Sequence, residues 1–326
     1  MSAPVSKAVF AVAVFALVGC EGPQSAFSGT APESSRVIFL TWVMIIGGTI
    51  ILAVVCGAIA AAISGPASWK RALRNERVIL YGGIAFPVIV LTLLLFYGFV
   101  LLRAGDSLVS DENALRVAVV GEQWWWRVIY ETRGGETFET ANELRIPVGR
   151  TVAIELTSAD VIHSFWVPAY AGKLDMIPGR TNTLHIKAKH PGLARGQCAE
   201  YCGGAHALMS FFVEALPEDE FEQWIEKEKS PALRNNEAGA RLFHAVGCGG
   251  CHTVRGTSAK GVIGPDLTHV ASRHSLAAAA LDNDEAAFQR WLRMHQKIKP
   301  DNRMPGFDFL SDEEIAELAS YLGGLE

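Results

Sequence analysis

The sequence is short of net charge, of cysteine and of repeated segments. Its 34 acidic residues barely outnumber 29 basic residues, which leaves a net charge of -5. A nucleic-acid partner would call for a basic face, so that class of function is disfavoured. The 326 residues contain six cysteines and show no internal repeat or low-complexity tract. The length allows two or three domains, and four of the six cysteines lie in two short motifs.

Charge is absent altogether from two long hydrophobic stretches. Residues 37–63 and 78–102 contain 27 and 25 residues without a charged side chain, enough for each to cross the roughly 30 Å hydrocarbon core as a helix. A buried core helix is the alternative, but uncharged runs of this length disfavour it. The connection between them carries basic residues, which mark it as the cytoplasmic side: Lys70, Arg71, Arg74 and Arg77. We therefore expect a transmembrane hairpin with everything after Arg103 outside.

Residues 1–19 are typical of an export signal. Lys7 precedes an apolar run over residues 8–18, which is too short to span a membrane. The run ends in "LVGC", which resembles a lipoprotein cleavage site and would make Cys20 a lipidated N-terminus. Ordinary signal cleavage nearby is the alternative. In both cases the chain is exported, and we expect a multi-pass protein of the bacterial inner membrane with its later domains on the periplasmic side.

Residues 115–216 lack helical periodicity. Short alternating runs such as "LRVAVVG" and "TVAIELTSAD" are rich in Val, Ile and Thr and are separated by turn residues, which predicts strands of an antiparallel sandwich. Residues 217–236 follow as an acidic helix and a linker. Residues 237–326 contain three amphipathic helical segments joined by Gly/Pro-rich loops. The predicted architecture is multidomain, with a transmembrane α-helical hairpin, a β-sandwich and an all-α domain on a flexible tether.

The sandwich region contains a concentration of metal-binding side chains. The loop "GQCAEYCGGAHALM" holds Cys198, Cys202, His206 and Met209, and His163 lies upstream in "SADVIHSFWVP". A disulfide has no use for the neighbouring histidines, and a structural zinc site gains nothing from a thioether. Thiolate, imidazole and a weak thioether suit copper in electron transfer. A mononuclear blue-copper site needs one cysteine, so two thiolates on one loop favour a pair of bridged copper ions.

The second motif is "CGGCH", formed by Cys248, Cys251 and His252. Cys-x-x-Cys-His is typical of covalent c-type haem attachment, with the histidine as one iron ligand. A thioredoxin-like redox pair is the alternative, but no βαβ pattern surrounds the motif. Met294 and Met304 are the candidates for the other iron ligand. We predict Met304, because it lies in a Pro-containing loop, whereas Met294 falls at the edge of an amphipathic helix face.

Residues 37–225 resemble subunit II of haem-copper cytochrome oxidases, and residues 237–325 resemble a class I cytochrome c. The resemblance rests on the cysteine loop, on "GEQWWWRVIY", on the hairpin and on the "GPDL" and "RMPGF" motifs. It implies a cupredoxin-like fold for the sandwich and a binuclear copper centre of the CuA type. The copper ligands that it implies are His163, Cys198, Cys202, His206, Met209 and the backbone carbonyl of Glu200.

The resemblance also implies roles beyond the copper ligands. Trp124, the first of three consecutive tryptophans, lies where the family accepts electrons into the copper centre. The Glu200 side chain reaches, in the family, toward a magnesium site at the boundary with subunit I. Trp125 stands where the family often has tyrosine, and the sequence assigns it no role.

The function implied is electron relay in a caa3-type cytochrome c oxidase. Electrons would pass from cytochrome c or another donor through haem c and copper to haem in subunit I, where oxygen is reduced to water with proton pumping. Neither hydrophobic stretch contains a histidine that could hold another haem, so this chain would not reduce oxygen itself. The expected partners are subunit I, other oxidase subunits and membrane lipid. Two alternatives remain, the copper subunit of a nitric oxide reductase and a membrane-tethered copper or haem chaperone or sensor.

Overall fold

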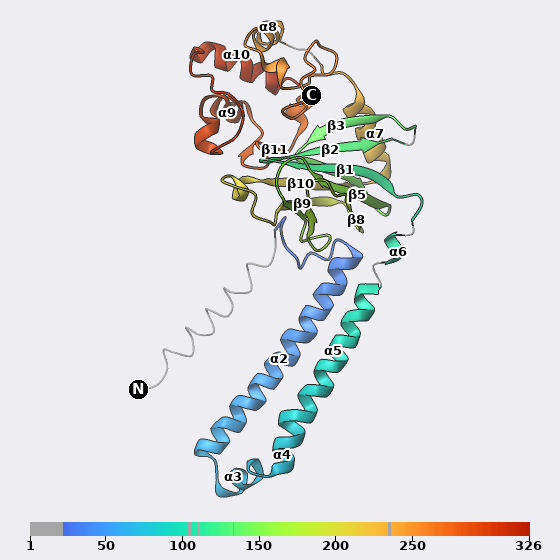
Figure 1. The fold of residues 1–326 in the computed structure, drawn as a ribbon, viewed down its shortest axis with the longest axis vertical. Coiled ribbons are helices and arrows are strands. Elements are labelled where there is room, and N and C mark those ends of the chain that lie inside the picture. Colours follow the sequence, from blue (N-terminus) through green and yellow to red (C-terminus); the bar gives the residue numbers. More distant parts are fainter. Residues whose placement is uncertain (1–21, 104–105, 110, 133, 234–235) are drawn as a thin grey trace. The chain divides into compact units, whose positions relative to one another are not determined.

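The computed structural model describes residues 22–103, 106–109, 111–132, 134–233 and 236–326 (Figure 1). They form two compact units, one of them Ser35–Asp111 and the other containing Glu112–Glu326. The predicted export signal and the predicted lipidation site Cys20 lie outside the described residues.

The smaller unit consists mainly of two long apolar helices. The first is α2 (Pro32–Ser64), and the second combines α4 (Glu76–Leu80), a π-helical turn η1 (Tyr81–Ala85) and α5 (Phe86–Arg103); α3 (Ala67–Leu73) joins them and α6 (Asp106–Val109) follows. Each contains an 18-residue stretch with a mean hydropathy of 2.6, and both helices are long enough to cross a membrane. The π-helical turn lies just before Pro87, whose ring cannot fit the regular helical hydrogen-bond pattern. The rings of Phe39 and Tyr97 are 6.4 Å apart, so the helices contact each other.

The larger unit begins with a sandwich of two five-stranded sheets, which we call the sandwich domain. Its strands are β1 (Leu115–Glu122), β2 (Trp125–Glu131), β3 (Thr137–Ala141), β4 (Glu143–Pro147), β5 (Thr151–Ser158), β6 (His163–Trp166), β7 (Leu174–Met176), β8 (Asn182–Lys187), β9 (Gly192–Cys198) and β10 (Ser210–Leu216). The sheet orders are β3-β2-β1-β5-β8 and β4-β10-β9-β6-β7. The cupredoxin-like class expected from the sequence is thereby confirmed.

The pairing of the strands differs in one respect from the expected antiparallel sandwich. Strands β1 and β5 are parallel, as are β4 and β10, whereas the remaining neighbours within the two sheets are antiparallel. The purely antiparallel prediction was wrong because strand composition does not reveal which distant strands pair. A parallel pair requires a long crossover, and here β2, β3 and β4 lie between β1 and β5 in the sequence.

The core of the sandwich supports the strands that carry the predicted copper ligands. Residues along β1 alternate between buried and less buried, as expected for a strand with one face on a core. The ring of Trp126 lies 5.8 Å from that of Phe165 and 4.9 Å from that of Phe211. It also lies 6.3 Å from the ring of His163. A rigid aromatic cluster therefore packs directly against this histidine.

The C-terminal domain, residues 237–326, is mainly helical. It follows α7 (Glu218–Lys229) and contains α8 (Glu237–Ala245), η3 (Cys248–Gly250), η4 (Val270–Ser272), β11 (Ser275–Leu276), β12 (Leu281–Asp282), α9 (Glu285–Ile298) and α10 (Asp312–Gly323). The side chains of Asn236, Asp284 and Ser311 each accept a hydrogen bond from a backbone N–H in the first turn of their helix. Such caps satisfy donors that have no partner inside the helix, and they explain where α8, α9 and α10 begin.

The C-terminal domain is docked on the sandwich domain. The flexible tether predicted from the sequence is therefore wrong. Helix α7 occupies most of the predicted linker. Four hydrogen bonds are among those that join the two domains: Arg145 to the Ser272 carbonyl (3.2 Å), Arg195 to the Ala279 carbonyl (3.2 Å), Arg255 to the Glu139 carbonyl (3.1 Å) and the Ser210 N–H to the Ala278 carbonyl (3.1 Å). The two domains accordingly belong to one compact unit.

Candidate metal centre and haem cavity

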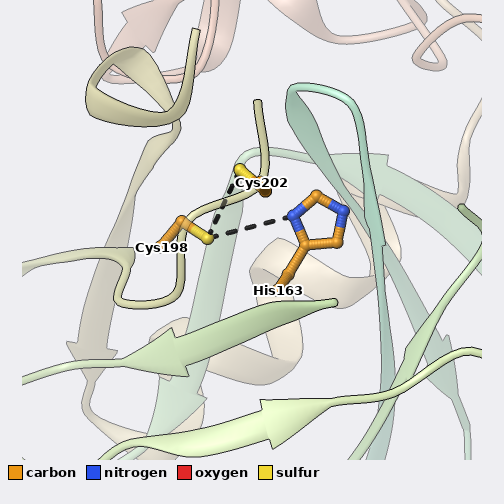
Figure 2. A group of neighbouring side chains, drawn as sticks. All are labelled: His163, Cys198 and Cys202. Atoms are coloured by element: carbon orange, nitrogen blue, oxygen red, sulfur yellow. Dashed lines mark hydrogen bonds between the residues drawn. The ribbon is translucent and has the colours of Figure 1, made fainter. Parts of the chain in front are cut away.

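Two free thiols form the centre of the first site. Cys198 ends β9 and Cys202 lies in the following loop, and both side chains are buried. Their Sγ atoms are 3.7 Å apart (Figure 2), whereas a disulfide has a length of about 2.05 Å. Two sulfur atoms that each lie about 2.3 Å from one tetrahedral metal ion are separated by nearly this distance. The spacing therefore fits thiolates that share metal ions.

The other predicted ligands surround this pair of thiols. His163, at the start of β6, is fully buried, and its Nδ1 is 3.9 Å from the Cys198 sulfur. His206 Nδ1 is 3.5 Å and Met209 Sδ is 3.9 Å from the Cys202 sulfur. The ligand atoms of His163 and the two cysteines all lie within 4.8 Å of one another. The arrangement offers two shared sulfurs, one imidazole near each of them, and a thioether.

Glu200 contributes to the loop in two ways. Its backbone carbonyl lies 3.2 Å from the Cys198 sulfur, where the resemblance placed a copper ligand. Its carboxylate lies 3.3 Å from the ammonium of Lys173, and both side chains are about half exposed. The carboxylate thus lies at the surface, paired with Lys173.

The surroundings of the two thiols shift their pKa values in opposite directions. A hydrogen bond from Cys202, helped by one from His163 and opposed by burial, lowers the pKa of the Cys198 thiol. The hydrogen bond to Cys198, together with burial, raises the pKa of Cys202. The surroundings therefore favour the thiolate form of Cys198, and thiolates are the form that binds metal ions.

Asp160 is a functional residue that sequence reasoning missed. Its Oδ1 lies 2.8 Å from His163 Nε2, the ring nitrogen that faces away from the thiols. A carboxylate in this position fixes the ring orientation and the tautomer of a metal-binding histidine. The signal available in the sequence was an aspartate three residues before the histidine. Gly121 provides the space for the ring, because a Cβ at that position would lie 2.8 Å from His163 Cδ2.

Trp124 packs on the cysteine loop. Its side chain is buried, and its indole N–H donates a hydrogen bond to the Cys202 carbonyl at 3.0 Å. The side-chain amide of Gln123 donates to the same carbonyl at 2.8 Å. Gly203 lies beneath the indole with a φ of +116°, and a Cβ there would lie 2.9 Å from the ring. The tryptophan is therefore locked to the backbone of a predicted copper ligand.

A cavity in the C-terminal domain contains all of the predicted haem-binding residues. Its wall includes Cys248, Cys251, His252 and Met304. Burial lowers the pKa of His252, and the Pro265 carbonyl lies 2.8 Å from its Nδ1. With the proton on Nδ1, the neutral ring leaves Nε2 available as an iron ligand.

The two methionines are clearly separated by the structure. Met304 lines the cavity, and its backbone is held by Asn302 Oδ1 at 3.1 Å and by His295 Nε2 at 3.0 Å. Met294 lies on α9, is 40% exposed and does not contribute to the cavity wall. His295 is buried by its contact with the Met304 loop rather than directed into the cavity. The geometry therefore supports Met304 as the iron ligand.

Both the apolar and the polar residues in the wall of the cavity suit a haem. Phe243, Leu292 and Phe307 contribute apolar surface. Two wall residues carry buried polar atoms without a hydrogen-bond partner, the Arg273 Nε and the Ser275 Oγ. Buried polar atoms are normally satisfied. A haem, which combines an apolar ring with two carboxylate arms, would supply both surfaces with partners.

The wall of this cavity is completed by the sandwich domain. Gln123, Trp124 and Trp125 line it together with the residues of the "CGGCH" motif. Trp125, to which the sequence assigned no role, is also covered by the guanidinium of Arg127, which lies 4.7 Å from its ring centre. Two neighbouring residues, Gln123 and Trp124, thus contact both the cysteine loop and the cavity.

Two protein families match the chain. The model of "Cytochrome C oxidase subunit II, periplasmic domain" matches residues 129–216, and the model of "Cytochrome c" matches residues 236–326. These matches coincide with the domain that carries the cysteine loop and with the domain that carries the cavity.

Several individual proteins are similar to parts of this chain. Cytochrome c oxidase subunit 2 of Alkalihalophilus pseudofirmus is 39% identical over 227 residues, which cover 68% of this chain and 64% of the relative. The chain thus spans slightly less than two thirds of that protein. Cytochrome c oxidase subunit 2 of Metridium senile is 32% identical over 60% of this chain and 85% of the relative. A solved structure, the periplasmic domain of subunit II of cytochrome oxidase from Bradyrhizobium japonicum, is 34% identical with a TM-score of 0.35 and covers 36% of this chain and 96% of that chain.

The family matches account for both sites. The free thiols, imidazoles and thioether lie in the domain that matches the oxidase subunit, and the cavity with the "CGGCH" motif lies in the domain that matches cytochrome c. The chain belongs to the cytochrome c oxidase subunit II family, in the form that carries a cytochrome c domain at its C-terminal end.

Proposed function

We propose that this chain is the electron-relay subunit of a haem-copper terminal oxidase. It would take electrons from cytochrome c or another donor and pass them to haem in subunit I, where oxygen is reduced to water with proton pumping. When bound, haem c and a copper pair supply the two one-electron carriers that this relay requires. The membership of the chain in the subunit II family and its two separate sites support this proposal.

We infer the following assignment of ligands from the geometry and from the resemblance. The copper ligands would be His163, Cys198, Cys202, His206, Met209 and the Glu200 carbonyl. Haem c would be attached to Cys248 and Cys251, with His252 and Met304 on either side of the iron. The two thiols and the His163 imidazole are buried, which excludes water from the copper site. A rigid and dry surrounding reduces the reorganisation that accompanies a change of charge.

The observation that carries the proposal is the position of Trp124. Trp124 contributes to the wall of the cavity, and its indole N–H donates a hydrogen bond to the carbonyl of Cys202. The two sites therefore meet at one buried aromatic residue. A chaperone or sensor would have no need to bring its two metal sites to the same residue.

The location and the remaining partners are part of the same proposal. The two apolar helices would anchor the chain in the bacterial inner membrane and pack against subunit I, with the sandwich and C-terminal domains on the periplasmic side. Cys20 would carry lipid. The exposed Glu200 carboxylate would reach a magnesium ion at the boundary with subunit I.

The test is to purify the complex that contains this chain from its native membrane. We expect an absorption spectrum of haem c, a mixed-valence copper signal in electron paramagnetic resonance, and oxygen uptake that depends on a reduced donor. Reduction of nitric oxide without oxygen uptake would favour the nitric oxide reductase instead. Stopped-flow measurements that show reduced haem c and no reduction of copper would favour a chaperone or sensor.

A further inference from the structure

Lys299 is a buried cation at the boundary between the two domains. It directly follows α9, and its side chain is only 3% exposed. Its ammonium donates one hydrogen bond to the Trp124 carbonyl of the sandwich domain and another, of 3.0 Å, to the Ala277 carbonyl of the C-terminal domain. An ammonium has three hydrogens. Two of them are therefore used to join the domains, and the third remains available.

The charge of Lys299 lacks a carboxylate partner. Among the described residues, no carboxylate oxygen lies within 4.0 Å of its ammonium. Burial lowers the pKa of Lys299 to about 7, and the nearby Cys202 opposes this only in part. A buried charge without a partner is costly. An anion bound next to Lys299 would remove that cost.

Lys299 belongs to the wall of the haem cavity, as do Arg273 and Ser275. Arg273 Nε and Ser275 Oγ are the buried polar atoms without a partner described above. These two residues lie in the segment that leads to Ala277, whose carbonyl Lys299 binds. One segment and one lysine thus bring three hydrogen-bond donors, two of them cationic, to the same cavity.

We propose that Lys299 pairs with a carboxylate arm of the bound haem and so couples haem loading to the docking of the C-terminal domain on Trp124. The inference rests on the proposed function, because it requires haem in this cavity. Haem would neutralise the buried ammonium while its other hydrogens hold the Trp124 and Ala277 carbonyls. Lys299 is a positioning residue in this scheme. It holds Trp124 in place while Trp124 in turn holds the Cys202 carbonyl.

Docking can be followed at one backbone amide. The Ser210 N–H of the sandwich domain donates to the Ala278 carbonyl of the C-terminal domain at 3.1 Å, so its hydrogen exchange reports separation of the domains. We would compare the full-length chain with and without attached haem, the latter from a host that lacks c-type haem attachment. The variants are Lys299→Met, Lys299→Gln, which keeps a donor but not the charge, and Lys297→Met as the control. Lys297 is exposed and lies two residues away.

In the wild type and in Lys297→Met, haem loading should slow Ser210 exchange by about tenfold, the effect of one hydrogen bond to a charged group. In Lys299→Met and Lys299→Gln most of this protection should be lost. The haem midpoint potential should fall in both variants, because a lost cation favours the more positive, oxidised haem. The absorption spectrum of haem c should remain unchanged.

Equal protection by haem in the wild type and in Lys299→Gln, with an unchanged midpoint potential, would overturn the coupling. If Lys299→Met does not fold, the same comparison rests on Lys299→Gln. Failure of the proposed function would look different, since the wild-type chain would then show no haem c absorption or no mixed-valence copper signal.

Discussion

The contact of His274 with the sandwich domain allows docking to be tested by pH. The His274 ring Nε2 lies 3.0 Å from Glu214 Oε2, and its backbone N–H donates to the carboxylate of Glu143. Arg145 lies 3.0 Å from Glu214, on the same side of the boundary. The histidine belongs to the C-terminal domain, whereas the two carboxylates and the arginine belong to β10 and β4. We predict that docking weakens as the pH rises from about 5 to about 7.5.

The sign follows from the pKa of each group. The hydrogen bond to Glu214 raises the pKa of His274, so its stabilising charge is complete below about 6.5 and is lost as the pH rises through the docked pKa. Burial raises the pKa of Glu143 from 4.5 to about 7, opposed by His274, Arg145 and Arg273. The docked state therefore favours the protonated form of Glu143, so protonation of Glu143 at low pH also stabilises docking. The pKa of Glu214 is lowered by His274, so its contribution is lost only under more acidic conditions.

The same contacts set the size of the pH effect on docking. A pKa of about 7 in place of 4.5 for Glu143 means that its charged form is disfavoured by on the order of 3 kcal/mol. A hydrogen bond between charged groups such as His274 and Glu214 contributes about 1.5–3 kcal/mol when buried, and this pair is partly exposed, so we take about 1.5 kcal/mol. His274→Ala should therefore raise the population of separated domains about tenfold at pH 6. The effect should shrink as the pH rises through the docked pKa of His274, above which its ring is neutral in both states.

The assay is hydrogen exchange of the Ser210 amide between pH 5.5 and 8, corrected for the intrinsic pH dependence of exchange. His244→Ala is the matched control, because His244 lies exposed on α8. Its profile should follow the wild type. If the corrected profile of His274→Ala also coincides with that of the wild type across this range, the cluster does not control docking and the reasoning is refuted.

Three further predictions concern the proposed ligands. Cys198→Ser should abolish the mixed-valence copper signal in electron paramagnetic resonance, because one bridging sulfur cannot hold a delocalised pair, while Cys56→Ser on α2 should leave it unchanged. Met304→Ala should leave haem attached but remove the thioether-to-iron charge-transfer band, whereas Met294→Ala should keep that band; the reverse result would exchange the assignments. Asp160→Asn should weaken copper binding about 10–100-fold, measured by competition with a chelator, and an unchanged affinity would show that the carboxylate does not orient the histidine.

Local spacing in the sequence was sufficient to predict which side chains meet in each site. Cys198, Cys202, His206 and Met209 lie within twelve positions of one another, so the conformation of one loop is enough to bring their side chains together. The choice of Met304 over Met294 also depended on local structure, a loop against a helix face. These roles stay predictions, but the structure brings the predicted groups together.

Contacts between distant residues could not be predicted in this way. Lys299 and Trp124 are 175 residues apart, and a lysine after an amphipathic helix is usually solvated. His274 belongs to no motif in the sequence, and its meeting with Glu214 depends on how two domains dock. The parallel pairing of β1 with β5 has the same origin. A sequence pattern reports which face of an element is apolar, but not which distant element covers it.

Docking gives a structural reason why electrons from a soluble donor should enter through the C-terminal domain. In the structure Trp124 is 6% exposed, and its carbonyl is bound by Lys299 of the C-terminal domain. A soluble cytochrome therefore has no access to this ring while the domain is docked. We predict that electrons can reach copper only through the C-terminal domain.

The test removes haem attachment but keeps the covering domain. The full-length chain with Cys248→Ala and Cys251→Ala, in its complex, should lose oxygen uptake with reduced cytochrome c as donor. It should retain uptake with a small reductant that can diffuse to the cysteine loop, which shows that copper and subunit I are intact. Undiminished turnover with cytochrome c at low concentration would mean that the donor reaches copper directly. Docking would then be transient, because a soluble protein could reach Trp124 only after the two domains had separated.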